Sequence, residues 1–322
     1  MGIKHLNRFF RNNVSSSMKF VSISELSGKK IAVDISIYLY KYALDGNLIE
    51  NMYLMLAIFR HYNVTPIFIF DGKPPPEKKE LLIKRREDKQ EAEQEYNKLK
   101  CILNSNSKID EDDKQEIINN MDILKRKFVR ISKNDIENVK HLMRAYGATY
   151  YDAPCEADEL CAMLTIKGKV WACLSEDMDM FVYGCPRVIR YLSLLNHTIV
   201  LYDMKEILDT LGFTQKELRE ICILSGTDYN SVNAESNHNL YTTLNYFKQY
   251  QQEKLDEDFY TWLIKTTDYI KNYELLKKIY SIFELSNDLK IKIFENVKIS
   301  SGPVIKNELY SILKKDGFIF PL

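Results

Sequence analysis

The sequence predicts an α/β protein with a mostly parallel β-sheet flanked by helices. Continuous apolar runs such as IAV, IFIF and VWACL have the length and composition of buried parallel strands. Stretches with apolar residues at helical spacing lie between these runs, and such alternation of strand and helix is typical of a parallel sheet covered by helices. After about residue 230 the strand patterns stop and helical patterns continue.

The strands are expected at the apolar runs, in chain order. A short amphipathic segment and a turn at Ser27-Gly28 precede the first of them. We expect parallel strands at residues 31–36 (IAVDIS), 66–70 (PIFIF), 148–154 (ATYYDAP) and 169–174 (KVWACL), then a hairpin formed by residues 188–194 and 197–203.

Helices are expected where apolar residues recur at helical spacing or where strong helix formers dominate. The run of prolines at 74–76 must leave the sheet abruptly, because proline cannot continue a strand. Residues 77–100 are highly charged and helix-forming, and the polar residues 101–120 form either a loop or a mobile helix pair. The other helices are expected at residues 48–62, 134–146, 155–167, 203–211 and 214–225, followed by a helical C-terminal subdomain.

Composition narrows the class of protein. The chain has 45 basic and 45 acidic residues, and this neutral balance does not exclude nucleic acid, because charge can be segregated on one face. The six cysteines form no CxxC pair, so we expect no zinc site and reduced thiols inside a cell. We expect no membrane partner, since no run of about 18 apolar residues occurs and the N-terminus lacks the apolar core of a secretion signal.

Acidic residues follow the apolar runs at four places: Asp34, Asp71, the pair Asp177 and Asp179, and Asp228. Because the carboxyl ends of parallel strands meet at one edge, where open α/β folds bind ligands, these side chains are expected to gather there. Gathered carboxylates repel one another unless a cation lies among them. We therefore expect divalent metal, and paired metals are the usual means of cleaving phosphodiesters.

Each of these acids has a simpler explanation when it is considered alone. Asp34, Asp71 and Asp228 are individually as well explained as helix caps or turn residues. Considered together, their recurrence at strand ends favours a metal site, and Asp177 and Asp179, two residues apart, can reach one cation. The five histidines share no motif, so we expect none of them to act as a general base.

A further acidic cluster, CEADEL, begins a predicted helix. Glu156 alone is better explained as an acid that stabilises the first turn of the helix, where the dipole favours negative charge. As neighbours of the strand-end acids, Glu156 and Asp158 become candidate ligands of the same metal site. Glu159 and Glu176 are expected to be solvated surface acids.

A basic segment, KPPPEKKELLIKRREDKQ, follows Asp71 directly. Lys78 and Arg85 lie seven residues apart, which is two turns of a helix, and therefore share a face. Acids alternate with these cations, so a solvated helix with pairs four residues apart is the simpler explanation. The position beside the acidic edge favours phosphate capture instead, because phosphate affinity is largely electrostatic. A second basic patch, KRKFVR, contributes Lys125, Arg126 and Lys127.

These segments together resemble the flap endonucleases, within the xeroderma pigmentosum group G class of structure-specific 5′ nucleases. The resemblance covers about residues 1–230 in the family's order, and the combination is far more specific than any single motif. The matching segments are MGIKHL, IAVDIS, FIFDGKPP, the basic helix, HLMRAYGATYYDAPCEADELCAML, GKVWACLSEDMDMFVYG and ELREICILSGTDY.

The resemblance implies a PIN-like core with a helical arch and an active site holding two Mg²⁺ ions, for which Mn²⁺ can substitute. It implies that Lys78 and Arg85 steer the scissile phosphate, that Gly2 packs near the active centre and that Tyr40 stacks on a terminal base. The implied substrate is branched or nicked duplex DNA, cut as a 5′-flap endonuclease and 5′–3′ exonuclease. The implied metal ligands are Asp34, Asp71, Glu156, Asp158, Asp177, Asp179 and Asp228.

The chain departs from the family's pattern in three respects. Asp158 stands where Glu is usual and is shorter by one methylene, about 1.5 Å of reach. The segment after Asp228, NSVNAESNHNLYTTLNYF, lacks the glycines with which the family approaches duplex DNA and a monovalent ion. The C-terminal tail carries neither a recognisable sliding-clamp motif nor a basic extension.

We expect a monomer inside the cell, in the nucleus or at a cytoplasmic viral replication site.

The resemblance divides the chain into four regions. They are residues 1–100 (N-terminal nuclease region with the start of the arch), 101–133 (the rest of the arch), 134–230 (internal nuclease region) and 231–322 (helical C-terminal subdomain).

Two other functions stay open: a 5′–3′ exonuclease on RNA or nicked duplex, and a catalytically silent nucleic-acid-binding scaffold. The acidic residues do not indicate whether the substrate is DNA or RNA, because a metal site built from them acts on the phosphate and not on the sugar.

Overall fold

The computed structural model describes residues 2–105, 111–230, 238–253, 256–285 and 297–318. Its strands are β1 (Met18–Ser22), β2 (Lys30–Asp34), β3 (Thr65–Phe70), β4 (Thr149–Asp152), β5 (Ala172–Leu174), β6 (Arg187–Ser193) and β7 (Thr198–Asp203). They form one seven-stranded sheet in the order β1-β7-β6-β5-β2-β3-β4. Neighbours from β6 to β4 pair in parallel, whereas β7 pairs antiparallel with both β6 and β1, so the expected mostly parallel sheet is confirmed.

The sequence pattern does not predict β1. This strand lies at the edge of the sheet and its residues are exposed or half-buried, with Phe20 exposed. An edge strand with no fully buried face does not need the continuous apolar run that marks the central strands.

Alternate residues of the central strands face two separate cores. Ala32 of β2 lies in one core and Val33 in the other, and Ile67 and Phe68 of β3 divide in the same way. This division follows from the two-residue repeat of a strand. The first core includes α1 (Leu6–Asn13), α7 (Ala157–Ile166), α8 (Asp179–Tyr183), α9 (Met204–Leu211), α10 (Gln215–Ser225), α11 (Leu240–Glu253), α12 (Phe259–Thr266) and α13 (Tyr273–Phe283). The second includes α2 (Ser36–Leu44), α3 (Leu48–His61), α6 (Lys133–Tyr146) and α15 (Lys306–Lys315).

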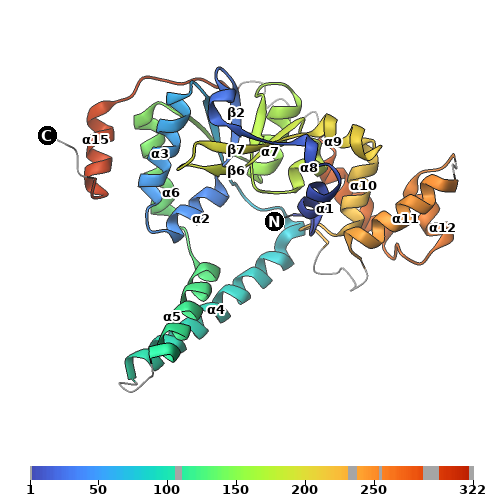
Figure 1. Ribbon diagram of the computed structural model, residues 1–322, viewed down its shortest axis with the longest axis horizontal. Helices are drawn as coiled ribbons and strands as arrows, with labels where there is room; N and C mark the ends of the chain where they lie inside the picture. The colour runs from blue at the N-terminus through green and yellow to red at the C-terminus, as the bar shows by residue number, and fades with distance from the viewer. Residues whose placement is uncertain (1, 106–110, 231–237, 254–255, 286–296, 319–322) are drawn as a thin grey trace.

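Two long helices, α4 (Lys79–Ser105) and α5 (Glu111–Phe128), project away from the sheet as an arch (Figure 1). Tyr96 and Phe128 hold them together with ring centroids 5.3 Å apart, and Arg130 pairs with Glu93 at 2.5 Å. The described part of residues 101–120 is therefore a helix pair, with 106–110 outside the described residues. No helix of the described chain is both long and apolar enough to cross a membrane.

Short 3₁₀ turns connect several elements: η1 (Ser15–Ser17), η2 (Ile23–Leu26) and η3 (Pro76–Lys78). The turn η3 matters for the site, because it places Lys78 before the start of α4. The expectation that Lys78 and Arg85 lie on one continuous α-helix is therefore wrong. The proline-rich segment ends in a tighter 3₁₀ turn that includes Pro76 and Lys78, and the α-helix starts at Lys79.

The last helix returns to the N-terminal half of the chain. Leu313 of α15 lies in the second core, and the N–H groups of Gly302 and Ile305 donate to the carbonyls of Gly147 and Ala145, each at 2.7 Å. Gly147 has φ 75°, and a Cβ there would lie 2.6 Å from the Gly302 carbonyl oxygen, so only glycine allows this approach. Within the region expected as the C-terminal subdomain, α15 thus packs against the second core.

Candidate active site

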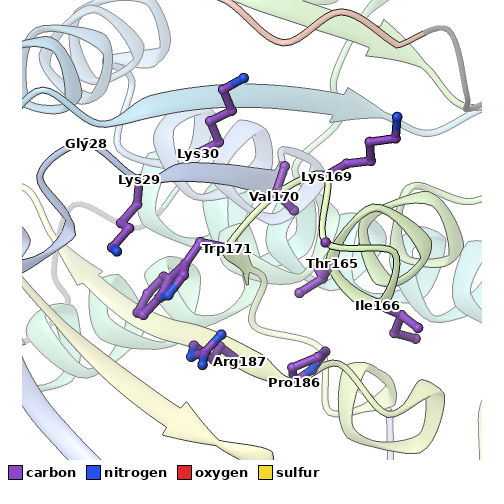
Figure 2. A pocket seen from close by; sticks show the side chains of 11 residues that line it. Gly28, Lys29, Lys30, Thr165, Ile166, Lys169, Val170, Trp171, Pro186 and Arg187 are labelled. Carbon is purple, nitrogen blue, oxygen red and sulfur yellow. The ribbon is translucent and has the colours of Figure 1, made fainter.

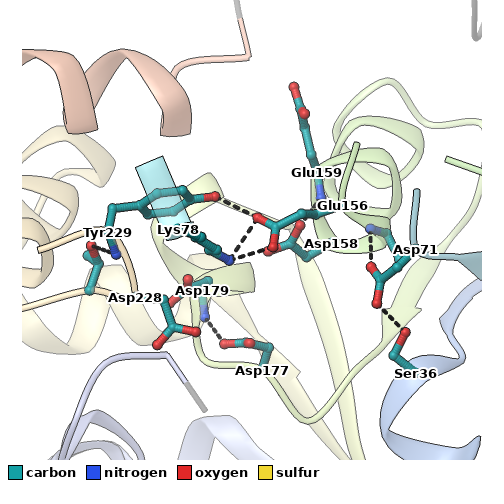
Figure 3. Close-up of polar contacts among 12 residues, drawn as sticks. Ser36, Asp71, Lys78, Glu156, Asp158, Glu159, Asp177, Asp179, Asp228 and Tyr229 are labelled. Atoms are coloured by element: carbon teal, nitrogen blue, oxygen red, sulfur yellow. Dashed lines mark hydrogen bonds and ion pairs between the residues drawn. The ribbon is translucent and has the colours of Figure 1, made fainter. Parts of the chain in front are cut away.

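Asp34 and Asp71 lie at the carboxyl ends of β2 and β3, as the strand pattern predicts. Asp34 is buried and accepts hydrogen bonds from Ser175 Oγ at 2.9 Å and from the Ser36 N–H at 3.2 Å. Asp71 is exposed and accepts bonds from the Ala157 N–H at 2.8 Å and from Ser36 Oγ (Figure 3). Burial, and then the charge of Asp71, raises the pKa of Asp34 to about 7.

Asp177 and Asp179 lie just past β5. Their spacing of two residues allows a hydrogen bond between them. The Asp179 N–H donates to Asp177 Oδ1 at 3.0 Å, so Asp177 supports the first turn of α8. Asp179 is almost fully buried, and neither of its carboxylate oxygens has a hydrogen-bond partner among the described residues. Burial, and then the charges of Asp177 and Asp158, raises the pKa of Asp179 well above its usual value. A buried carboxylate without a donor is costly, which marks this position as a place for a cation.

Lys78 places a positively charged side chain among the carboxylates at this edge of the sheet. Its Nζ lies 2.8 Å from Glu156 Oε1 and 2.7 Å from Oε2, and its side chain is 8% exposed (Figure 3). Burial lowers the pKa of Lys78, but the negative charges of Asp158 and Glu156 outweigh the effect of burial. The pKa of Lys78 is therefore raised. Asp158, also buried, has a pKa raised well above its usual value by burial, against the opposing charge of Lys78.

Tyr229 is a site residue that the sequence reasoning missed. Its hydroxyl donates to Glu156 Oε2 at 2.8 Å, and its ring centroid lies 4.6 Å from Lys78 Nζ. One aromatic side chain thus holds both the acid and the cation (Figure 3). The only sequence signal is its place directly after Asp228, in the motif GTDY. Ser36 and Ser175, which hold Asp71 and Asp34, were missed as well.

Arg85 makes the second link between the arch and the acidic edge. Its Nη2 lies 2.7 Å from Asp228 Oδ2, and its side chain remains 43% exposed. Lys78 and Arg85 therefore both contact carboxylates at this edge, although Lys78 lies in the 3₁₀ turn η3 and Arg85 lies in α4. Glu176, expected to be solvated, instead lies 3.3 Å from Arg190 Nε and accepts from the Tyr191 N–H at 2.5 Å.

Gly2 lies against the same carboxylates. A Cβ on Gly2 would be 2.3 Å from Asp177 Oδ1 and 2.4 Å from Asp179 Oδ1, and Gly2 has φ 70°. These distances are too short for any side chain, so the absence of a Cβ allows the N-terminal segment to approach the two acids. The expected closeness of Gly2 to the acidic cluster agrees with this geometry.

The remaining predicted contacts lie at the base of the arch. Tyr40 of α2 is 45% exposed, and Lys89 Nζ lies 4.9 Å from its ring centroid. Lys127 lines a cavity of about 710 Å³ between the arch helices together with Arg85 and Lys89. Lys125 and Arg126 are exposed in the last turn of α5, and no described contact brings them to the acidic cluster.

The donor set suits a hard divalent ion, because carboxylate oxygens are the ligands that Mg²⁺ and Mn²⁺ prefer. Within the described ranges no three acidic, histidine or cysteine side chains already form a ready-made metal site. Several of the carboxylates are instead held by other groups of the protein: Lys78 holds Glu156, Arg85 holds Asp228, Ser175 holds Asp34, and Ser36 and the Ala157 N–H hold Asp71. The buried, partnerless oxygens of Asp179 nevertheless leave a charge that a metal ion at this edge would compensate.

Two regions of the chain match models of one protein family. Residues 1–92 match the XPG N-terminal domain, and residues 147–228 match the XPG I-region. All seven carboxylates implied as metal ligands fall within these two regions.

Curated relatives named flap endonuclease 1 match 71% of this chain. The protein of Xenopus tropicalis is 30% identical over 247 residues, covering 61% of its own length. That of Nematostella vectensis is 32% identical over 247 residues, covering 62% of its length. The chain therefore spans about three fifths of the length of the curated relatives it matches.

Solved nuclease structures share the fold. The catalytic core of Rad2 in complex with DNA substrate has a TM-score of 0.65 at 20% identity, covering 96% of this chain and 93% of that one. Flap endonuclease-1 from Methanococcus jannaschii has a TM-score of 0.62 at 22% identity, covering 93% and 90%. The Holliday junction-resolving enzyme GEN1 with product DNA and Mg²⁺ has a TM-score of 0.62 at 17% identity, covering 95% and 72%. These likenesses confirm the PIN-like fold.

Proposed function

This chain belongs to the XPG family, and from that premise we propose that it is a structure-specific 5′ nuclease that hydrolyses DNA phosphodiesters. The observation that carries the proposal is the acidic sheet edge, where both oxygens of Asp179 are buried without a partner among the described residues. Relatives named flap endonuclease 1, and Rad2 and GEN1 structures that contain DNA, support branched or nicked duplex DNA as the substrate. The intact acidic set argues against a catalytically silent scaffold.

The proposed ligands of two Mg²⁺ ions, with Mn²⁺ as a substitute, are Asp34, Asp71, Glu156, Asp158, Asp177, Asp179 and Asp228. Such ions supply an activated water and stabilise charge on the leaving oxygen. The residues that hold these acids orient them: Ser175 and Ser36 hold Asp34, and Tyr229 holds Glu156. Their hydrogen bonds limit the freedom of each carboxylate, as is usual around metal ligands.

Lys78 and Arg85 act on the phosphate in this proposal. Each is paired with one carboxylate of the cluster, Glu156 or Asp228. A phosphate at this edge presents oxygens of the same charge, so both cations can turn from the acids to the substrate. There they offset the charge that develops on the phosphate as the bond breaks. The exposed ring of Tyr40 offers a stacking surface for a terminal base.

We propose an intracellular, DNA-containing compartment, the nucleus, as the site of action. The six cysteines are all free thiols, which suits a reducing environment. We also propose that the protein acts as a monomer.

The test compares cleavage of a 5′-flap duplex, a nicked duplex and an RNA of equal length, each with and without Mg²⁺. We expect Mg²⁺-dependent cutting of the DNA substrates near the junction. Asp179→Ala should abolish cleavage and retain DNA binding, whereas Asp209→Ala, an exposed acid on α9, should behave like the parent protein. Near-normal turnover of Asp179→Ala would refute the mechanism, and preferential cutting of RNA would refute the substrate.

A further inference from the structure

The amino ends of the central strands carry positive charge, in contrast to the acidic carboxyl ends. Lys30 begins β2, Arg187 begins β6, and Lys169 lies just before β5. These three strands are neighbours in the sheet, so their starts lie side by side (Figure 2). At about 3.3 Å per residue, the four steps from Lys30 to Asp34 place this region about 13 Å from the acidic edge.

Four cations, Lys29, Lys30, Lys169 and Arg187, line one cavity of about 500 Å³. Figure 2 shows Lys29 and Arg187 on either side of the indole of Trp171, whereas the side chains of Lys30 and Lys169 extend away from this group. No acidic residue of the described part of the chain lines the cavity. Its other lining residues are Gly28, Thr165, Ile166, Gly168, Val170, Trp171 and Pro186.

The charge of this cavity is largely uncompensated. Among the described residues, Lys29, Lys30 and Lys169 form no ion pair, and Arg187 has one long contact, from Nε to Asp203 Oδ2 at 3.8 Å. Trp171 orders two of the cations, since Lys29 Nζ and the Arg187 guanidinium carbon lie 5.7 and 4.9 Å from its ring centroid. An aromatic ring that holds cations in place without neutralising them leaves their N–H groups free to bind an anion.

We propose that this cavity is a phosphate-binding site, separate from the acidic edge. The ligand is a phosphate group, either free, on a nucleotide, or in the backbone of a polynucleotide. Arg187 offers paired donors to two phosphate oxygens, and Lys29, on the other side of Trp171, supplies a point charge beside them. Lys30 and Lys169 add positive charge along the lining of the cavity. The proposal does not depend on the nuclease activity, because it uses none of the residues assigned to cleavage.

The sequence holds two tryptophans, Trp171 and Trp262, and this makes the test direct. In ¹⁵N-labelled full-length protein with EDTA, the indole N–H signal of Trp171 is identified as the one absent from Trp171→Phe. The protein is then titrated separately with inorganic phosphate, with thymidine monophosphate and with a 5′-phosphorylated oligonucleotide. We expect at least one probe to shift the Trp171 signal saturably while the signal of the buried Trp262 stays in place, and the probe that binds identifies the source of the phosphate.

The charge variant Lys29→Glu/Lys169→Glu should weaken that binding by about tenfold or more, as expected for the loss of charge-assisted contacts. The matched control Lys205→Glu/Lys306→Glu makes the same charge change at exposed positions on α9 and α15 and should bind as the parent does. If the first variant is less stable on heating, Lys29→Gln/Lys169→Gln replaces it. Absence of a Trp171 shift with all three probes, or equal weakening in the control, would overturn the proposal and leave these cations a purely structural role.

Discussion

The ammonium of Lys78 lies within 2.8 Å of both carboxylate oxygens of Glu156, buried at the edge of the sheet where the other acids gather. The turn η3, at the base of the arch, therefore contributes a cation that partly neutralises the acids at this edge. A metal ion bound at the proposed site would compete with Lys78 for Glu156, because both cations are attracted by the same carboxylate. This competition allows the role of Lys78 to be measured without DNA.

Replacing Lys78 with Met removes that competing cation. We expect a lower melting temperature in EDTA, because Glu156 and Asp158 lose their compensating charge. We expect Mg²⁺ to raise the melting temperature of Lys78→Met by more than it raises that of the parent protein, and cleavage to fall by roughly 10²- to 10³-fold. Thermal melts with increasing Mg²⁺ measure the first effect. Lys84→Met, at an exposed position on α4, is the control, and an equal Mg²⁺ response in the two variants would contradict the competition.

Replacing Tyr229 with Phe removes one hydrogen bond and keeps the ring beside Lys78. We expect Glu156 to lose its orientation and the Mg²⁺ concentration needed for half-maximal cleavage to rise about tenfold, as for other residues that hold metal ligands. Tyr250→Phe, whose hydroxyl donates to the Glu257 carbonyl, is the control. An unchanged Mg²⁺ midpoint in Tyr229→Phe would show that this hydroxyl does not position Glu156.

Replacing Gly2 with Ala tests the close approach of the N-terminal segment. The new Cβ would overlap with Asp177 and Asp179, so we expect turnover to fall by about 100-fold, the usual cost of displacing catalytic groups by about 1 Å. Gly28→Ala provides a matched control, because Gly28 has φ 73° and a Cβ at this position would have no atom within 4 Å. The control should show only the small stability cost of a positive φ. Equal turnover in the two variants would argue that the contact with the acids is unimportant.

The raised pKa of Glu220, which lies outside the candidate active site, predicts that the stability of the protein depends on pH. Burial raises the pKa of this α10 residue to about 7, against the opposing charge of Lys216, and Asp258 and Glu217 add to the shift. The folded protein then binds more protons than the unfolded chain between pH about 4.5 and about 7, so this contribution to stability is complete at low pH and is lost as the pH rises through that window. A shift of this size corresponds to roughly 3 kcal/mol.

Urea unfolding of the parent and of Glu220→Gln at pH 5 and pH 8 measures this contribution. We expect the variant to lose less stability than the parent on going to pH 8. Glu25→Gln, at an exposed position, should follow the parent at both pH values. If the parent and Glu220→Gln lose the same stability between the two pH values, the carboxyl of Glu220 is not the group responsible.

Much of the scaffold could be predicted from residue patterns. The central strands and most helices coincide with apolar runs and helical spacing, because burial on both faces imposes those patterns locally. Edge strand β1 and the 3₁₀ turn at Lys78 could not be predicted in this way, since neither depends on a periodic apolar face. The return of α15 onto the second core depends on glycine contacts between residues 147 and 302, which no local pattern encodes.

The sequence by itself determined that Asp34 and Asp71 lie at one edge of the sheet, because residues that end neighbouring parallel strands lie there whatever the details of packing. Only the tertiary structure decided which cation meets which acid: Lys78 with Glu156, Arg85 with Asp228, and Tyr229 between Lys78 and Glu156. These partners are separated by more than 70 residues along the chain. Their distances depend on how the arch, α7 and the segment after α10 pack together, and local sequence periodicity carries no information about that packing.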